Sequence, residues 1–368
     1  MKPEEIFSFL KEWYGKPDYH FEYNNVSDEL LMIYILVYLP IPKEGNFTST
    51  IITAGFSSLG IQLYEHKVEC VFELKGTLTE MEYEKLGREL VKQFNECIPF
   101  LPNGVHSPIV IKSYPYFTGC LILNYGKHES HIWETDPTIR VFELIPLYKE
   151  EVKTLSEQPI DITNAIIFRS DKVDWTDWER SQVNPIEEAT SGVWDFIVKW
   201  YEENSPRIFS QLGTGANRKS IIQLNEVLGV LLPDDFIASL MIYNGEVEFH
   251  DYKYLSSTEI AETWTMMKEL LDSNSFPAQL HNNRKIEEIK EVWWHENWIP
   301  FAKDGGGNLM CLDMNPTPSG NKGQIIYWEK TEGPIPTQYK SFFHWLYTYE
   351  QGLYGGYYKV DEEGFIYY

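Results

Sequence analysis

The stretch WIPFAKDGGGNLMCLDMNPTPSGNKGQIIYW, Trp298 to Trp328, decides the fold of the C-terminal half of this chain. Three successive glycines, Gly305 to Gly307, follow Asp304, and glycine enters positive φ without a steric cost. The segments on either side of the glycines are apolar and aromatic, as half-buried strands are. The stretch therefore predicts three short strands joined by tight turns.

The segments that flank this stretch have helical patterns. LPDDFIASLMIYNG (Leu232 to Gly245) is bounded by Pro233 and by Asn244 and Gly245, which are residue types that commonly end helices. SFFHWLYTYEQGL (Ser341 to Leu353) predicts an aromatic closing helix. Two more helices are expected before the strands, one from its N-cap Ser220 to Gly229 and one over Ser257–Ser273. This order of helices, strands and helix predicts an α+β domain.

The N-terminal half also mixes strand and helix patterns. In Val68–Leu74 apolar residues alternate with Glu69 and Glu73, which predicts a strand with one solvent-exposed face. Thr79 followed by Glu82 predicts a capping box at the start of a helix. The other expected elements are a helix at Pro3–Tyr14, strands at Leu30–Leu39, Ile51–Ser57, Pro108–Lys112, Gly119–Tyr125 and Ile139–Ile145, and a short helix from Tyr148.

These motifs resemble two known families. The three segments of the C-terminal half resemble the SUKH superfamily. The N-terminal half resembles the suppressor-of-fused-like domain family in TAGFS (Thr53 to Ser57) and VFELIPLYKEEVKTL (Val141 to Leu155). The resemblance implies an α+β protein of two domains, each a mainly antiparallel sheet packed with helices. We expect the first domain at residues 1–160, a linker at 161–183 and the SUKH-type domain at 184–368.

The resemblance also implies a function. SUKH proteins are best known as immunity proteins against secreted bacterial toxins, and bacterial suppressor-of-fused-like domains are associated with toxin immunity as well. We therefore expect an antitoxin that binds a polymorphic toxin, for example a nuclease, and occludes its active site. In SUKH domains the toxin-binding cleft is placed near the signature loops, which here are Asn244, Gly245, Asp304, Gly305 and Asp313.

Aromatic residues near the signature are further candidates for partner binding. Trp298, Tyr327 and Trp328 flank the glycine turn, and Trp293 is followed by Trp294. Adjacent residues on a helix or strand cannot both face one core, which leaves one of each adjacent pair as a candidate for exposure. Tryptophan and tyrosine dominate binding hot spots, but packing of most of these side chains in the core is the favoured interpretation.

Charge and composition restrict the partner and the compartment. The 31 basic and 55 acidic residues give a net charge of −24, which argues against direct nucleic-acid binding and favours a basic protein partner. The four cysteines show no disulfide or metal-ligand spacing, as buried thiols in a reducing compartment would. The N-terminus lacks a signal-peptide pattern, and the longest apolar run, Leu30 to Leu39, is too short to cross a membrane. We expect a cytoplasmic protein.

Motifs for other chemistry are weak. LGTGANRKS (Leu212 to Ser220) has Arg218 where a phosphate-binding loop needs glycine before the lysine. Asp304–Asn308 could bind an anion, or a metal together with Asp313, but a hairpin turn is favoured. No residues are marked for catalysis, so no enzyme activity, cofactor or metal is expected. The alternatives to an immunity protein are a regulatory scaffold for an endogenous partner, a hydrolase with an unrecognised site, and an acidic DNA mimic.

Overall fold

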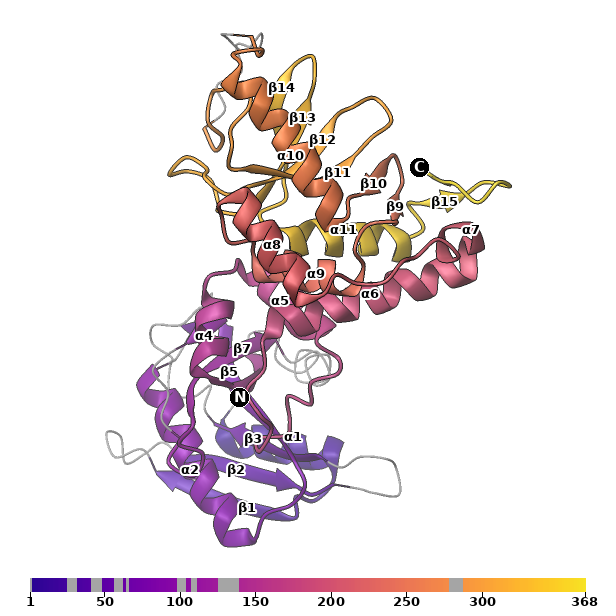
Figure 1. Cartoon of the computed structure of the whole chain (residues 1–368). Coiled ribbons are helices and arrows are strands. Elements are labelled where there is room, and N and C mark those ends of the chain that lie inside the picture. Colours follow the sequence, from indigo (N-terminus) through magenta and orange to yellow (C-terminus); the bar gives the residue numbers. More distant parts are fainter. Residues whose placement is uncertain are drawn as a thin grey trace. The chain divides into compact units, whose positions relative to one another are not determined.

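The computed structural model describes residues 2–24, 32–40, 48–55, 62–63, 66–97, 104–106, 111–124, 139–277 and 287–368. These residues form an α+β structure that divides into two compact units (Figure 1). Unit 1 consists of residues 1–164 and 173–185, and unit 2 of residues 165–172 and 186–368.

Unit 1 is built on an eight-stranded mixed sheet with the order β1-β2-β3-β5-β8-β7-β6, and β4 pairs with β5. Only the β5–β8 pair is parallel, so the sheet is mainly antiparallel as predicted. The strands are β1 Tyr19–Asn24, β2 Met32–Tyr38, β3 Thr48–Ala54, β4 Gln62–Leu63, β5 His66–Lys75, β6 Gly104–His106, β7 Phe117–Asn124 and β8 Ile139–Tyr148. The helices are α1 Pro3–Tyr14, α2 Glu80–Cys97 and α4 Lys149–Ser156, and α5 Ile160–Arg169 is divided between the two units after residue 164. The strand predicted at Pro108–Lys112 lies largely outside the described residues.

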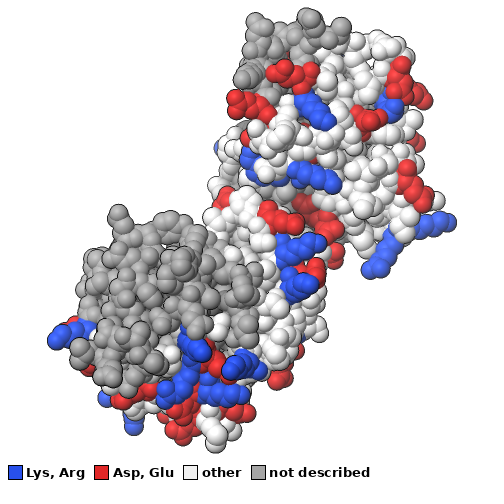
Figure 2. All heavy atoms as spheres, turned by 90° about the vertical axis from the view of Figure 1, so that its left-hand side faces the viewer, with Lys and Arg blue, Asp and Glu red and all other residues white. Residues whose placement is uncertain are grey.

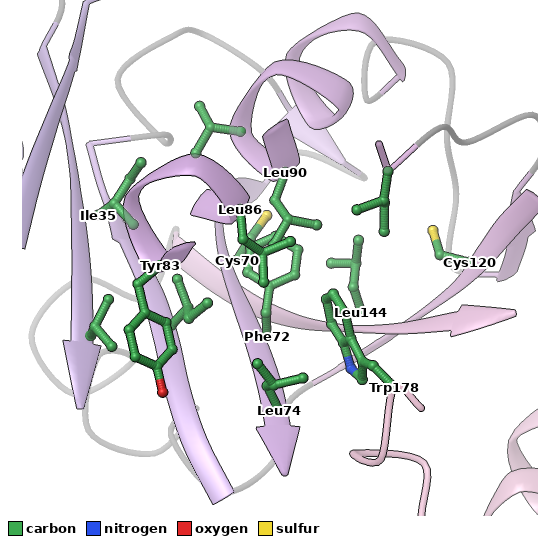
Figure 3. Close-up of a cluster of buried hydrophobic side chains, with 14 of the residues drawn as sticks. Ile35, Cys70, Phe72, Leu74, Tyr83, Leu86, Leu90, Cys120, Leu144 and Trp178 are labelled. Atoms are coloured by element: carbon green, nitrogen blue, oxygen red, sulfur yellow. The ribbon is translucent and has the colours of Figure 1, made fainter. Parts of the chain in front are cut away.

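Both faces of the unit 1 sheet are covered, which corrects the prediction of one solvent-exposed face. The larger core packs α2 side chains such as Leu86 and Leu90 against Cys70 and Phe72 of β5 (Figure 3). The opposite face carries Val71 in a second core with Ile6 and Leu10 of α1. The alternation along β5 was recognised, but a helix that covers the far face is not visible in the strand's own sequence.

Glu69, predicted to be solvated, is fully buried on this second face. Its carboxylate accepts hydrogen bonds from the Thr53 hydroxyl at 2.6 Å and from the Gly55 N–H at 3.0 Å. Both donors belong to the TAGFS motif at the end of β3. A buried carboxylate needs such partners, because burial without them is costly.

Residues expected to act as a linker contribute to the core of unit 1. Trp178 is 1% exposed and packs in the larger core beside Leu144 (Figure 3). Arg180 forms a bidentate ion pair with the buried Glu151, with N–O distances of 2.6 and 2.8 Å, and its guanidinium stacks over the Trp175 ring at 4.6 Å. Residues 173–185 therefore belong structurally to unit 1.

Unit 2 contains a six-stranded antiparallel sheet with the order β14-β13-β12-β11-β10-β9 and a separate two-stranded ribbon, β15-β16. The strands are β9 Glu248–Phe249, β10 Tyr252–Tyr254, β11 Trp298–Lys303, β12 Leu309–Asp313, β13 Gln324–Glu329, β14 Gly333–Pro336, β15 Lys359–Val360 and β16 Ile366–Tyr367. The helices are α6 Pro185–Asn204, α7 Pro206–Phe209, α8 Arg218–Leu228, α9 Asp234–Ile242, α10 Ser257–Asp272 and α11 Phe342–Tyr354. The three strands predicted between Trp298 and Trp328 are confirmed as β11, β12 and β13.

The six-stranded sheet of unit 2 also packs on both faces. On one face Phe301 contacts Phe236 of α9 and Phe342 and Trp345 of α11, with ring centroids 5.0–6.0 Å apart. The other face carries a tryptophan cluster together with Met267 of α10. The helices predicted on either side of the strands therefore form the two outer layers of this sheet.

Two local predictions in unit 2 are wrong in detail. Trp293 and Trp294 are both buried in the tryptophan cluster, because they lie in an irregular segment where adjacent side chains need not point in opposite directions. The N-cap of α8 is Asn217 and not Ser220: the Asn217 side chain accepts the Ser220 N–H at 3.0 Å.

Candidate partner-binding site

The glycine-rich signature forms a tight turn between β11 and β12. The Asp304 carboxylate accepts the N–H groups of Gly306 and Asn308, both at 2.8 Å, and the Asn308 side-chain amide at 2.7 Å. Gly307 has φ of +89°, which favours glycine. Burial opposes ionisation of Asp304, but the hydrogen bonds from Asn308 and Gly306 outweigh it and hold its pKa below the ordinary value. The predicted hairpin turn is confirmed.

Asp304 and Asp313 lie at opposite ends of the β11–β12 hairpin. Asp313 pairs with Trp298 at the start of β11, whereas Asp304 follows the last residue of β11. The Asp313 side chain is fully buried. Its carboxylate accepts a hydrogen bond from the Asn315 backbone N–H at 3.1 Å and another from the Gln324 side-chain amide at 3.2 Å. The two aspartates therefore do not form one metal or anion site.

Besides Asp313, four of the predicted binding residues are in the interior or support it. Trp298 is 0% and Trp328 is 5% exposed, and both pack against Trp294 with ring centroids 5.8 and 5.6 Å apart. Gly245 is buried with φ of +81°, and a Cβ there would lie 2.6 Å from the Ser256 nitrogen. The half-buried Asn244 accepts the Ser257 N–H at 2.7 Å at the start of α10.

The predicted binding residues that are accessible to solvent lie around the glycine turn. Gly305 is exposed, and Asp304 and Tyr327 are half-buried. The Tyr327 ring meets Tyr252 of β10 edge to face, with centroids 6.3 Å apart. Burial, followed by the charge on Asp304, raises the pKa of Tyr327, which places this phenol close to the turn carboxylate. Asp304, Gly305 and Tyr327 therefore remain the predicted contact residues, and sequence reasoning missed Tyr252.

The segment that carries all eight predicted residues also identifies its family. Residues 215–348 match the SMI1 / KNR4 family (SUKH-1). The SUKH-1 segment contains the glycine turn, the six-stranded sheet and the helices on both of its faces. The resemblance inferred from the signature is therefore confirmed for this part of the chain.

Curated relatives with this similarity include three fungal proteins. The Glucan synthesis regulatory protein of Neurospora crassa is 27% identical over 49% of this chain and 41% of that protein. The Cell wall biosynthesis/cell cycle regulator smi1 of Schizosaccharomyces pombe is 25% identical over 46% of this chain and 37% of that protein. The Cell wall assembly regulator SMI1 of Saccharomyces cerevisiae is 23% identical over 36% of this chain and 34% of that protein. Each alignment spans less than half of the relative.

Similar solved structures include suppressor-of-fused proteins. A putative suppressor-of-fused homologue from Neisseria gonorrhoeae has a TM-score of 0.35 and 16% identity, covering 49% of this chain and 95% of that chain. Drosophila Suppressor of Fused has a TM-score of 0.35 and 11% identity, covering 58% of this chain and 56% of that chain.

Asp235 has a structural role that sequence reasoning missed. Its side chain in α9 accepts the N–H of Phe343 in the first turn of α11 at 2.8 Å, and also the Phe236 N–H at 2.8 Å. Burial raises the pKa of Asp235 to about 6, although both hydrogen bonds oppose the rise. Nothing in the local sequence indicates this contact, because the bonded residue lies 108 positions away.

Other acids with a raised pKa in unit 2 are also held by structural contacts. Burial raises the pKa of Glu350 to about 7, against the opposing effect of its ion-pair partner Arg169. Burial likewise raises the pKa of Asp313. A surface hollow of about 330 Å³ lies at the end of α8, and none of these acids is among its lining residues: Ile222, Asn225, Glu226, Gly229, Val230 and Leu231. Asp235, Asp313 and Glu350 therefore give the hydrolase alternative no support at this hollow.

The segment that superficially resembles a phosphate-binding loop packs against α9. The Ala216 N–H donates to the Leu240 carbonyl at 2.7 Å, and a Cβ on Gly215 would lie 1.7 Å from the Met241 carbonyl oxygen. Gly215 therefore permits a close backbone approach, which is a structural use of glycine.

Metal, membrane and charge features add few constraints. Among the described residues, no group of three or more His, Cys, Asp or Glu side chains is placed to hold a metal ion. No helix in the same ranges is long and apolar enough to cross a bilayer. Cys70, Cys120 and Cys311 are buried, and the Cys97 side chain lies outside the described residues. On the face in Figure 2, acidic and basic side chains are interspersed, which gives no support to a DNA mimic on that face.

Proposed function

We propose that this chain is an immunity protein that binds a protein toxin in the cytoplasm and occludes its active site. The observation that carries the proposal is the SUKH-1 match over residues 215–348, since the SUKH superfamily includes immunity proteins. The net charge of −24 supports a basic toxin, of which nucleases are one class.

Neutralisation by binding requires a complementary surface and no catalytic group. The accessible residues around the glycine turn provide hydrogen-bonding backbone, a carboxylate and an aromatic ring at Gly305, Asp304 and Tyr327. Tyrosine at such a position can contribute a large share of binding energy. The acidic field would accelerate association with a basic toxin, and this gain in rate would fall as salt screens the charges.

The proposal is tested by capture and protection. The full chain is used to capture proteins from an extract of its native cells at about 50 mM and about 500 mM salt, and the captured proteins are identified by mass. Each is then expressed in a host cell with and without this chain. Restored growth of a host that otherwise dies supports immunity, whereas captured proteins that are harmless alone, or toxic regardless of this chain, contradict it.

A regulatory scaffold is the second candidate, and the names of the fungal relatives favour it. Those proteins are named as regulators of glucan synthesis and of cell wall assembly. In that case the captured partner would be a resident enzyme or signalling protein, and removing this chain from the native cell would change that partner's activity without exposing the cell to a toxin.

A further inference from the structure

Five large aromatic side chains are exposed within the last fifteen residues of the sequence. Their exposed fractions are 74% for Tyr354, 62% for Tyr357, 42% for Phe365, 45% for Tyr367 and 60% for Tyr368. Folded chains rarely gather so much exposed aromatic surface without a use, and such clusters commonly mark interaction sites. These residues lie beyond the SUKH-1 match, which ends at residue 348.

Two of these tyrosines belong to a connected group of rings. The Tyr368 ring lies 5.0 Å from Tyr357 and 5.4 Å from Tyr358. It also lies 4.0 Å from the ring of His250, in the turn between β9 and β10. The ribbon that carries these residues lies beside β9 and β10 in Figure 1.

Asp251 connects this group to the accessible part of the predicted site. Its carboxylate lies 2.8 Å from His250 Nδ1, and 72% of its side chain is exposed. Burial first, and then neighbouring charges that include Asp251, raise the pKa of both Tyr368 and Tyr252. Tyr252 in turn contacts Tyr327 beside the glycine turn. The tyrosine surface is defined as Tyr252, Tyr327, Tyr357, Tyr358 and Tyr368. His250 connects it to Asp251, because the His250 ring contacts Tyr358 and Tyr368 and its Nδ1 lies 2.8 Å from the Asp251 carboxylate.

Charges near the tyrosine surface favour a cationic partner. The turn of the β15–β16 ribbon carries the exposed acids Asp361, Glu362 and Glu363. Two nearby cations are already engaged within the chain: the Lys330 ammonium donates to the Gly306 carbonyl at 2.7 Å, and the Lys253 ammonium pairs with Glu259 at 3.0 Å. Lys359 in β15 is a further exposed cation on the same ribbon, and the three acids of the ribbon turn outnumber it.

Unit 2 itself contains an arginine bound by a ring and a carboxylate. The Arg207 guanidinium lies 3.8 Å from the centre of the Phe365 ring and pairs with both carboxylate oxygens of Glu248, at 2.7 and 3.2 Å. A planar guanidinium suits this arrangement, because it stacks on a ring while its N–H groups reach a carboxylate in the same plane. Tyr368 and Asp251 offer the same pair of groups at the surface.

We propose that Tyr357, Tyr368 and Asp251 form a docking surface for an arginine-bearing segment of a protein partner. The inference rests on the proposed function and specifies the chemistry of the surface that the partner presents. Tyrosine rings bind the guanidinium faces, and Asp251 accepts their N–H groups. Arginine is preferred to lysine, because the compact ammonium neither stacks nor forms two parallel hydrogen bonds.

The test measures binding of fluorescent nona-arginine and nona-lysine peptides to the full chain by anisotropy at about 150 mM salt. The variants are the double change Tyr357→Ala with Tyr368→Ala, and Asp251→Asn. The matched controls are Tyr354→Ala, an exposed tyrosine that packs against Phe196, and Asp272→Asn, an exposed acid on α10. Urea unfolding of each variant confirms that it is folded.

We expect the nona-arginine peptide to bind more tightly than the nona-lysine peptide, with about a tenfold loss for the double variant and about a threefold loss for Asp251→Asn. The controls should change by less than about twofold. Equal binding of the two peptides, or equal losses in the control variants, would show general charge attraction and overturn the proposal.

Sedimentation of the wild-type chain gives one further decisive outcome. A dimer that the double variant converts to a monomer would assign the tyrosine surface to self-association and overturn the proposal. The protection experiment reports separately on the proposed function. Failure to protect against any captured toxin, together with tyrosine-dependent arginine binding, would reject immunity and leave the docking surface standing.

Discussion

Replacing Asp235 by asparagine tests whether burial or hydrogen bonding controls the charge of this carboxyl group. The side chain is 2% exposed and joins α9 to the first turn of α11 through the Phe343 N–H. Asparagine has nearly the shape of the protonated carboxyl group and one strong acceptor, but it cannot ionise. The variant therefore isolates the free energy of the charge.

The magnitude follows from the pKa shift. Burial raises the pKa of Asp235 from 3.8 to about 6, which corresponds to about 3 kcal/mol. Because the native state holds the proton more tightly than the unfolded state, stability falls as pH rises from about 4 to about 6. Relative to Asp235→Asn, the wild type should lose about 2.5 kcal/mol of unfolding free energy between pH 4 and pH 7.

The assay follows urea unfolding of the full chain at several pH values by hydrogen exchange of peptides, read by mass. A single unfolding curve for the whole chain would mix two units, whereas peptides from α11 report on unit 2 alone. Asp234→Asn is the matched control, because the same change one residue earlier affects an exposed side chain. We expect its pH dependence to differ from wild type by less than about 0.5 kcal/mol.

The direction of the effect separates the two physical causes. If the N–H groups of Phe343 and Phe236 outweighed burial, they would favour the ionised carboxylate and lower its pKa. The wild type would then gain stability over Asp235→Asn as pH rises. That result, or a difference independent of pH, would refute the reasoning.

Three further changes have expected outcomes in the same assay. Gly215→Ala should destabilise unit 2 by about 3 kcal/mol or more, because the new Cβ would overlap the Met241 carbonyl oxygen; a loss below about 1 kcal/mol would show that the backbone yields easily. Glu151→Gln should destabilise unit 1 by about 3–5 kcal/mol, because it leaves the Arg180 charge buried without its partner, and peptides from unit 2 should be unaffected. Asp304→Ala should cost unit 2 about 1–2 kcal/mol through the lost turn hydrogen bonds, so a loss of partner binding at unchanged stability would instead mark Asp304 as a contact residue.

Local signals in the sequence predicted much of the secondary structure. The capping box is present, with the Thr79 N–H 2.8 Å from the Glu82 carboxylate, and α1 has the predicted bounds Pro3–Tyr14. These features depend on residues a few positions apart. Burial of Glu69 and the bond from Phe343 to Asp235 could not be predicted in this way, because each depends on which distant element packs beside the residue.

A family signature says little about a partner, because the packing of the fold constrains many of its residues. Trp298, Asp313 and Gly245 are buried where the fold requires a large ring, a hydrogen-bonded carboxylate and a positive φ. Residues under such constraints identify the fold, and members of one family can share them while binding different proteins. Residues that choose a partner must instead be accessible, and the proposed docking residues Tyr357 and Tyr368 are exposed and lie beyond the SUKH-1 segment. Exchanging Tyr357 and Tyr368 between relatives should therefore transfer partner preference, whereas exchanging the buried Trp298, Asp313 or Gly245 should change stability alone.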